Sequence, residues 1–199
     1  MTRPYNERSY SIHPSTIMMV LVFLGITALF GALTFAYLYA RVDKEMNSIR
    51  IPVLFVINSI VLASSSFFIQ QCRKHFDLRN EPRLLKNGYL TLAATILFLI
   101  LQSIAWNQLM QKQLLPGSSG GHGYLYAISI LHFLHVVAGI PFLVRIIWPL
   151  YPAYKEGNSA LFFINDANRR KLKHTAWYWH FIDVIWVYLV GFFLVNSLL

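Results

Sequence analysis

The chain has 199 residues, of which 56% are hydrophobic and only 13% are charged, and its formal net charge is +9. Soluble domains carry about 25% charged residues, so this composition excludes a disordered chain and argues against a soluble globule. The single cysteine, Cys72, excludes an internal disulfide and argues against iron–sulfur or dicopper ligation.

The positions of the charges predict five membrane-crossing helices. Of the 25 charged residues, 24 fall between five long apolar stretches, and only Asp183 lies within one of them. A bilayer core of ~30 Å needs about 20 helical residues, and a lipid environment favours helix for such runs. We therefore predict an all-α, polytopic membrane protein that forms a single membrane domain over residues 1–199. The predicted helices cover residues 16–40, 51–71, 88–110, 123–147 and 177–198.

The loops between these helices predict the orientation of the chain. Thirteen Lys and Arg residues fall in the N-terminal tail, the 73–86 loop and the 145–173 segment, against four on the opposite side. Because cytoplasmic loops carry the excess of basic residues, we expect a cytoplasmic N-terminus and a C-terminus outside. The basic residues then act as topology signals and contacts for anionic lipid, which argues against nucleic-acid binding. The densest cluster precedes the last helix and comprises Arg169, Arg170, Lys171 and Lys173.

The longest predicted connection is a cytoplasmic loop over residues 149–176. It contains Pro149, Pro152 and Gly157 and ends just before the last helix. Asn165 or Asp166 can cap a helix that leads directly into that last membrane helix.

Small residues at helical spacing predict where helices pack together. The first helix carries Gly25, Ala28, Ala32 and Ala36, and the fourth carries Gly139. In membranes such residues let helix backbones approach closely. We therefore expect a compact bundle.

The ionisable residues inside the predicted helices are the natural functional candidates, because they are costly to place in lipid. They are His132 and His135 in the fourth helix and His180 and Asp183 in the fifth. Each pair is spaced i, i+3 and so shares a helix face. The helical rise places Asp183 within about one turn of Gly139 and His135. We predict an inter-helix hydrogen-bonded network of these four residues, which either fixes two helices together or carries protons.

The same residues argue against a metal centre in this chain. His132 and His135 lie on the same helix, whereas a haem held by two histidines needs one from each of two facing helices. The predicted helices hold a single carboxylate, whereas di-iron sites need several. Neither a His-Glu-x-x-His pattern nor paired cysteines are present for zinc. One histidine from each of the last two helices could still ligate a haem, and this stays an alternative.

Two segments carry a family resemblance. Residues 131–139, Leu-His-Phe-Leu-His-Val-Val-Ala-Gly, resemble the His-x-x-His-Val-x-x-Gly signature of subunit III of haem–copper terminal oxidases. Residues 179–186, Trp-His-Phe-Ile-Asp-Val-Ile-Trp, resemble the family's Trp-His-Phe-x-Asp-x-x-Trp signature in the last helix. The second and third helices are similar as well, with Asn58 and Trp106 among the matching residues. The resemblance spans roughly residues 15–198 and is to the five-helix bacterial form.

This resemblance implies a non-redox accessory subunit of a cytochrome c oxidase, a proton-pumping complex of aerobic respiration that reduces oxygen to water. Haem and copper would reside in partner subunits, and this chain would hold no cofactor, no metal and no catalytic centre. The subunit would pack on oxidase subunit I in the bacterial inner membrane, with subunit II and further respiratory complexes as other partners. It would also bind phospholipid and sustain proton uptake and stable turnover.

One departure from the family and three alternatives bear on this interpretation. Many members carry a Ser-Glu pair in the helix matching residues 16–40, and Thr27 stands where the Glu would be. A role tied to that carboxylate is therefore not expected here. Within the family, a quinol oxidase or a nitric-oxide-reductase-associated homologue is the alternative. A stand-alone small transporter or proton channel is the alternative from another class.

Overall fold

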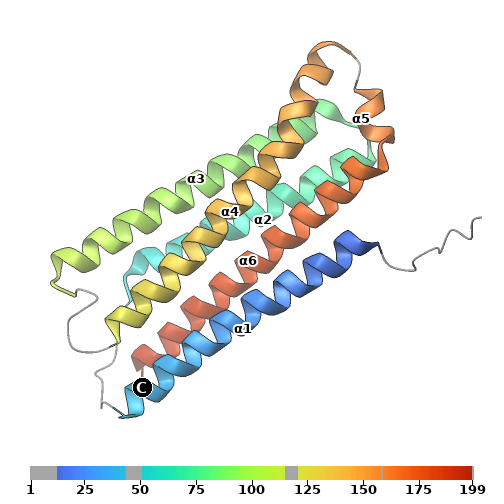
Figure 1. Ribbon diagram of the computed structural model, residues 1–199. Coiled ribbons are helices and arrows are strands. Elements are labelled where there is room, and N and C mark those ends of the chain that lie inside the picture. Colours follow the sequence, from blue (N-terminus) through green and yellow to red (C-terminus); the bar gives the residue numbers. More distant parts are fainter. Residues whose placement is uncertain (1–12, 44–50, 115–120, 158, 199) are drawn as a thin grey trace, which may run out of the picture.

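The computed structural model describes residues 13–43, 51–114, 121–157 and 159–198, and nearly all of them are helical (Figure 1). In chain order the helices are α1 (Pro14–Asp43), α2 (Val53–Asp77), α3 (Glu81–Gln111), α4 (His122–Lys155), α5 (Ala160–Ile164) and α6 (Asp166–Leu198). Within these residues five helices, all but the short α5, are long and apolar enough to cross a membrane. The predicted all-α fold with five such helices is confirmed. The N-terminal tail, on which part of the predicted orientation depends, lies outside the described residues.

The predicted loop over residues 149–176 is wrong for most of its length. α4 continues through Pro149 and Pro152 to Lys155, and α6 begins at Asp166. Proline removes a helical hydrogen bond without forcing the helix to end, and these prolines lie beyond the predicted span, where water can bond the freed carbonyls. The side chain of Asn165 accepts the backbone N–H of Ala167 at 2.9 Å, as expected of a residue that caps α6.

Local signals in the sequence explain the tight α2–α3 hairpin. The side chain of Asn80 accepts the backbone N–H of Arg83 at 3.2 Å, and Pro82 occupies the first turn of α3. Proline suits this position because its missing N–H would have no helical partner there. Arg79, with φ of 50°, makes the sharp change of direction between the two helices.

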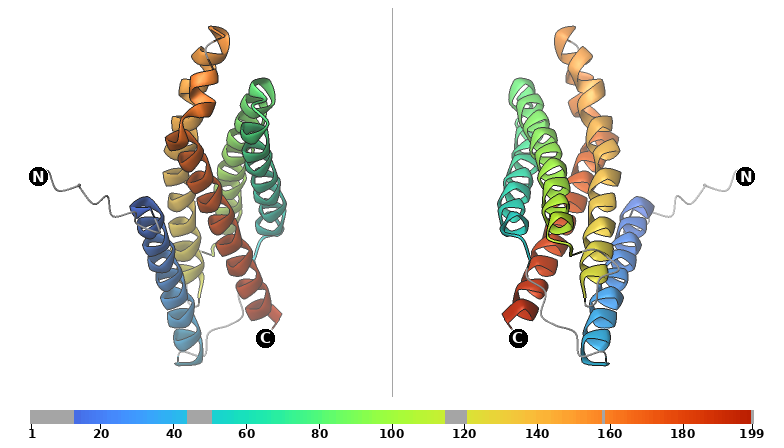
Figure 2. Two further views of the ribbon diagram at one scale, coloured as in Figure 1. Left: turned by 90° about the vertical axis from the view of Figure 1, so that its right-hand side faces the viewer. Right: turned by 90° about the vertical axis from the view of Figure 1, so that its left-hand side faces the viewer.

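The long helices lie roughly along one another, with α6 in a central place. α6 packs against α2 and α4, and α4 also packs against α3. Figure 2 shows α6 running obliquely between the α2–α3 pair and α4. The start of α1, the α2–α3 turn and the α4–α6 connection lie at the same end of the bundle (Figure 1). We call this the basic end, because most of the 17 Lys and Arg residues lie on the helix ends that meet there, within residues 73–86 and 145–173.

The core of the bundle forms where α2, α3, α4 and α6 meet. The Trp186 ring stacks on Phe55 at 5.5 Å between centroids, meets Phe98 edge-on at 5.2 Å and lies 4.8 Å from the His132 ring. A fully buried pair, Asn58 and Gln102, joins α2 to α3 through an amide hydrogen bond of 2.9 Å. Aromatic packing and one polar pair therefore fix the relative positions of four helices.

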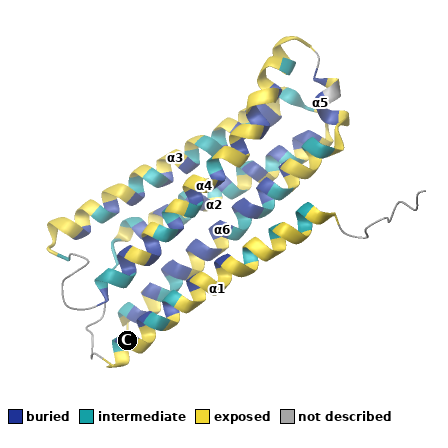
Figure 3. Cartoon of the chain, viewed as in Figure 1, coloured by how far each residue is buried: buried dark blue, intermediate teal, exposed yellow. Residues whose placement is uncertain are grey.

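Helix α1 is attached at the periphery and is exposed along its outer side (Figure 3). It turns large side chains inward, among them Phe30 and Tyr37. Gly25, Ala28 and Ala32 face outward, and a Cβ added to Gly25 would meet nothing within 4 Å. The prediction that this seam packs helices within the chain is wrong for these three residues. The large side chains take the inward positions instead, with Phe30 against His135 of α4 and Tyr37 against Phe193 of α6.

Gly139 of α4, in contrast, lies at a close helix contact. A Cβ added there would lie 3.0 Å from Tyr178 Cε1 and 3.1 Å from Trp179 Cζ3, both on α6. The missing side chain therefore allows two large aromatic residues of α6 to pack directly on the α4 backbone.

Candidate functional site

A chain of hydrogen-bonded side chains connects α2 and α6 from the basic end inward. Ser66 of α2 donates a hydrogen bond to the carboxylate of Asp183, which is only 8% exposed. The Ser66 Oγ also lies 2.9 Å from Nδ1 of His180. On the side of the basic end, His180 Nε2 lies 3.4 Å from Gln70 Oε1, to which Arg73 donates at 3.5 Å. Five polar side chains thus lead from the end of α2 to a buried carboxylate.

The predicted network of four ionisable residues is wrong in its membership. His180 and Asp183 are joined through Ser66, but the two histidines of α4 bond elsewhere. His132 donates from Nε2 to the backbone carbonyl of Ile182 at 3.2 Å, and His135 donates from Nδ1 to a carbonyl of its own helix at 2.7 Å. Backbone carbonyls lie within reach of both rings, and α2 rather than α4 supplies the partner for Asp183.

The three consecutive serines of α2, residues 64–66, have separate roles. Ser66 bonds Asp183, and Ser65 accepts the indole N–H of Trp179 at 2.8 Å. Ser64 instead donates to Val61 O of its own helix at 2.6 Å. The run of serines was the available signal, but sequence spacing does not reveal which of them faces a partner helix.

Asp183 and Gly139 lie beside the same small cavity, as their predicted depths indicate. Its volume is about 10 Å³, and its walls are mainly apolar: Leu62, Val136, Gly139, Tyr178, Trp179, Ile182 and Asp183. A water molecule needs roughly 10–15 Å³ of such volume. The cavity beside the carboxylate is therefore no larger than one water molecule.

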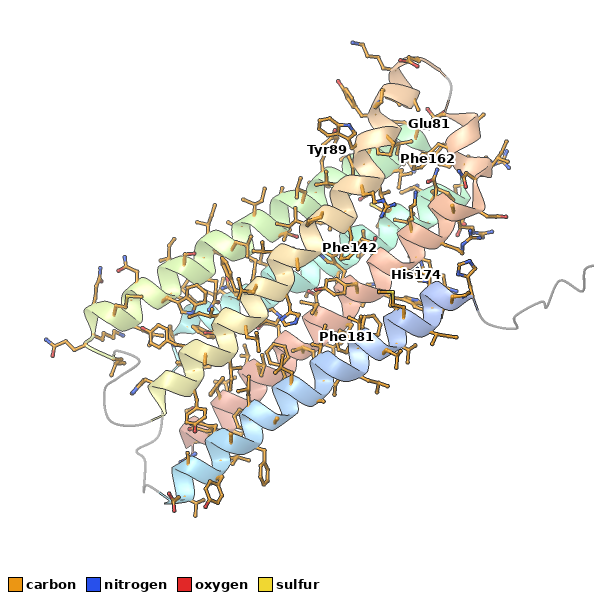
Figure 4. The ribbon with its side chains drawn as sticks, in the orientation of Figure 1. Glu81, Tyr89, Phe142, Phe162, His174 and Phe181 are labelled. Carbon is orange, nitrogen blue, oxygen red and sulfur yellow. The ribbon has the colours of Figure 1, made fainter. Side chains whose placement is uncertain are left out.

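A much larger cavity, which we call the interhelical groove, lies between α1, α4 and α6. Its volume is about 460 Å³. Figure 4 shows Phe142 and His174, which line it, on α4 and α6. The other lining residues are mostly apolar inside the bundle and polar or basic toward the basic end: Ser15, Met18, Met19, Val22, Ile26, His135, Arg145, Ile146, Lys171, Thr175 and Tyr178.

The mouth of the interhelical groove is basic. Arg145 and Lys171 line it from α4 and α6, and His174 lies 3.4 Å from the hydroxyl of Thr16 on α1. Deeper in, the Tyr178 hydroxyl donates to the backbone carbonyl of His135 at 2.8 Å, so this hydroxyl is satisfied within the protein. An apolar interior with cations at one end suits an amphipathic anion.

The predicted basic cluster is divided between two cavities. Lys171 lines the interhelical groove, whereas Arg169 and Lys173 line a second cavity between α2 and α6. Arg170 is exposed and lines neither of them. Sequence reasoning identified the cluster but did not find Arg73 and Arg145, which α2 and α4 add to it.

The haem alternative does not fit the surroundings of His132. This side chain is fully buried, and the rings of Phe98 and Trp186 lie against it at centroid distances of 5.9 and 4.8 Å. Among the residues that the structure describes, no three His, Cys, Asp or Glu side chains gather as a metal site would require.

Thr27, where the family resemblance would place a glutamate, bonds its own helix. Its hydroxyl donates to the carbonyl of Phe23 at 2.8 Å, and the residue is exposed on α1. The Thr27 hydroxyl is thus satisfied within α1 and does not join α1 to another helix.

Comparison with known proteins agrees with the family resemblance of residues 131–139 and 179–186. A family model described as cytochrome c oxidase subunit III matches residues 33–196. Cytochrome c oxidase subunit 3 of Hippopotamus amphibius is 25% identical over 147 residues, which cover 73% of this chain and 50% of that protein. The same subunit of Aepyceros melampus is 25% identical over 145 residues, covering 72% and 49%. The chain thus spans about half the length of the curated relatives it matches.

Proposed function

Because the chain belongs to the cytochrome c oxidase subunit III family, we propose that it is a non-redox accessory subunit of a proton-pumping oxidase that reduces oxygen to water. In this proposal the haem and copper centres reside in partner subunits I and II, and the complex lies in a bacterial inner membrane. The observation that carries the proposal is the family match over residues 33–196, which contains both the 131–139 and the 179–186 signatures.

Co-purification tests this proposal. A tagged chain is extracted from its native membrane in mild detergent, and the reduced-minus-oxidised absorption spectrum of the product is recorded. We expect a haem-bearing partner that consumes oxygen with reduced cytochrome c. Oxygen consumption with quinol alone would identify the quinol-oxidase alternative. A chain that purifies without haem and conducts protons in liposomes would contradict the proposal and favour a stand-alone channel.

The exposed side of α1 supports packing on another subunit. Gly25, Ala28 and Ala32 form a strip of small residues on a helix that buries little of its surface within the chain. Small residues allow a neighbouring helix to approach closely. In the proposed complex a helix of subunit I lies against this side, and replacing Ala32 by leucine is expected to reduce the yield of haem-bearing partner.

Phospholipid binding is the second part of the proposed function, and the interhelical groove supports it. Its walls are apolar between α1, α4 and α6, and Arg145, Lys171 and His174 stand at its mouth. An acyl chain would lie along Phe142 and Ile146, with the phosphate near the basic side chains. Such a lipid would also fill the gap under α1, which the protein itself fills incompletely.

A charge-removing variant tests lipid binding by the groove. Arg145→Gln combined with Lys171→Gln is expected to reduce the amount of anionic phospholipid that co-purifies, and to shorten the time for which the oxidase turns over before it loses activity. The exposed Arg170→Gln is the control because it removes a positive charge of the same cluster outside both cavities. Equal lipid content in all three proteins would contradict the groove as the binding site.

Support of proton uptake is the third part, and the hydrogen-bonded chain from Arg73 to Asp183 supports it. The chain begins at the basic end, which the loop charges predict to be cytoplasmic. Asp183→Asn tests the proposal. Slower proton uptake by an otherwise assembled oxidase is the expected result, and unchanged uptake with unchanged assembly would contradict any role of the carboxylate.

A further inference from the structure

A second cavity lies on the opposite side of α6 from the interhelical groove. It is formed by the last turns of α2 and the first turns of α6, has a volume of about 250 Å³, and is lined by Arg73, Phe76, Asp77, Arg169, Leu172 and Lys173. We call it the α2–α6 pocket. Phe76 and Leu172 are buried and form its apolar floor, and the basic side chains surround that floor.

The charges of the α2–α6 pocket favour an anion. Arg73, Arg169 and Lys173 bring three positive charges, and Asp77 brings one negative charge. Arg169 and Asp77 form an ion pair of 3.0 Å, but their side chains are 66% and 58% exposed. Exposed pairs of this kind contribute little to stability, so Arg169 can exchange this contact for a better acceptor. Two cations from two different helices remain without a carboxylate in the pocket.

The depth of the pocket matches the headgroup layer of a membrane. Arg73 and Asp77 lie two and six residues beyond the predicted end of the second span at residue 71, which is about 3–9 Å at the helical rise. The headgroup layer is about 5–7 Å thick on each side of the hydrocarbon core. The Lys173 ammonium lies 4.6 Å over the Trp177 ring, and tryptophan is typical of this layer.

We propose that the α2–α6 pocket binds the phosphate of an anionic phospholipid headgroup. Arginine and lysine side chains donate charge-assisted hydrogen bonds to phosphate oxygens, and Arg73 and Arg169 approach from opposite helices. The pocket holds a headgroup only, because its small apolar floor leaves the acyl chains to lie outside along α2 and α6. A lipid bound here would join the ends of these two helices at the start of the hydrogen-bonded chain that leads through Gln70 to Asp183. This site is separate from the interhelical groove and does not depend on the identity of the oxidase partners.

Native mass spectrometry of the full chain, extracted in detergent and supplied with phosphatidylglycerol, tests the proposal. The variant Arg73→Gln/Arg169→Gln/Lys173→Gln is expected to bind phosphatidylglycerol at this site at least about tenfold more weakly. Arg170→Gln is the matched control because it lies on the same helix and lines neither cavity. Lys171→Gln changes only the lining of the interhelical groove. Loss of phosphatidylglycerol binding at the groove can therefore be distinguished from loss of binding at the α2–α6 pocket. Equal binding by the triple variant and by Arg170→Gln would overturn the proposal.

Asp77→Asn keeps the test independent of any folding defect in the triple variant. This change removes the one negative charge of the pocket and releases Arg169, so phosphatidylglycerol should bind about threefold more tightly. Weaker or unchanged binding by Asp77→Asn would count against the proposal.

Two further probes identify the source of the phosphate. Phosphatidylcholine, whose headgroup carries no net charge, should bind much less than phosphatidylglycerol, and inorganic phosphate should displace the lipid only at far higher concentration. If inorganic phosphate alone occupies the pocket as tightly as phosphatidylglycerol does, the ligand is a free anion and the lipid assignment is wrong.

Discussion

The hydroxyl of Ser66 on α2 donates a hydrogen bond to the carboxylate of Asp183 on α6. Asp183 is the one carboxylate within the predicted membrane spans, so this contact decides how a buried carboxyl group is accommodated. The same hydroxyl also meets the His180 ring at 2.9 Å, and one serine therefore joins two polar residues of α6 to α2.

Replacing Ser66 by alanine should weaken the contact between α2 and α6. The change leaves the Asp183 carboxyl and the His180 ring without their shared partner inside the bundle. Hydrogen bonds between membrane helices contribute about 0.6 kcal/mol on average and up to about 1.7 kcal/mol. We expect a loss at the upper end of this range, because two groups lose a partner. The free energy of unfolding, measured by SDS titration in mixed micelles, checks the prediction.

Ser64→Ala is the matched control for Ser66→Ala. Ser64 lies two residues earlier on α2, but its hydroxyl bonds the carbonyl of Val61 in its own helix. Its removal should change the free energy of unfolding by no more than about 0.5 kcal/mol. Similar losses for both variants would show that helix-internal effects of the serines, rather than the contact with Asp183, determine stability.

Sequence reasoning predicted the fold well and the polar contacts poorly. The gaps between charges predicted five membrane helices because lipid imposes helix on any long apolar run. Depth along a helix was also predictable, since the rise per residue is fixed, and Asp183 does lie beside the same cavity as Gly139. The rotation of each helix about its axis was not predictable, and rotation decides whether His135 meets Asp183 or a carbonyl of its own helix.

The orientation of α1 shows the same limit. Its small residues and its large apolar residues are both spaced to form a helix face, and either face could have turned inward. Packing against α4 and α6 selects Phe30 and Tyr37, and Gly25 is left outside. Periodicity in a chain surrounded by lipid therefore does not distinguish the face toward the bundle from the face away from it, because both are apolar.

Gly139→Ala should destabilise the bundle. The new Cβ would lie 3.0 Å from Tyr178 and 3.1 Å from Trp179, so both rings have to move. Overpacking of this kind costs about 1–3 kcal/mol, partly offset by about 1 kcal/mol from the better helix propensity of alanine. We expect a net loss on the order of 1 kcal/mol, measured by SDS titration.

Gly191→Ala separates packing from helix propensity. Gly191 lies in α6, and a Cβ added there would meet nothing within 4 Å. This variant should be unchanged or more stable by up to about 1 kcal/mol. If Gly139→Ala is as stable as Gly191→Ala, the close contact between α4 and the aromatic residues of α6 is not maintained in the membrane.

Arg41→Met should loosen the end of the bundle opposite the basic end. Arg41 of α1 donates from Nη1 to both the backbone carbonyl and the side-chain oxygen of Asn196, each at 2.8 Å. A cation near the last carbonyls of α6 is also favoured by the helix dipole. We expect a loss of about 1–3 kcal/mol in the free energy of unfolding, typical of a hydrogen bond from a charged group. Lys112→Met removes a charge from an exposed residue at the same end and should change stability by less than about 0.5 kcal/mol.

The predicted orientation can be tested at the two ends of α3. Lys86 lies in the first turns of α3 at the basic end, and Lys112 follows its last residue at the opposite end. Both are exposed, and the native Cys72 is buried, so a single new cysteine in a Cys72→Ser background reports one end of one helix. A maleimide that cannot cross membranes is applied to intact spheroplasts and again after permeabilisation.

The excess of Lys and Arg at the basic end predicts that this end lies in the cytoplasm. Lys112→Cys should therefore be labelled in intact spheroplasts, and Lys86→Cys only after permeabilisation. Each variant removes one positive charge, so neither changes the difference between the thirteen and four basic residues enough to reverse it. The opposite labelling pattern would place the hydrogen-bonded chain to Asp183 and both basic cavities on the outer side, and proton uptake from the cytoplasm through this chain would then be contradicted as well.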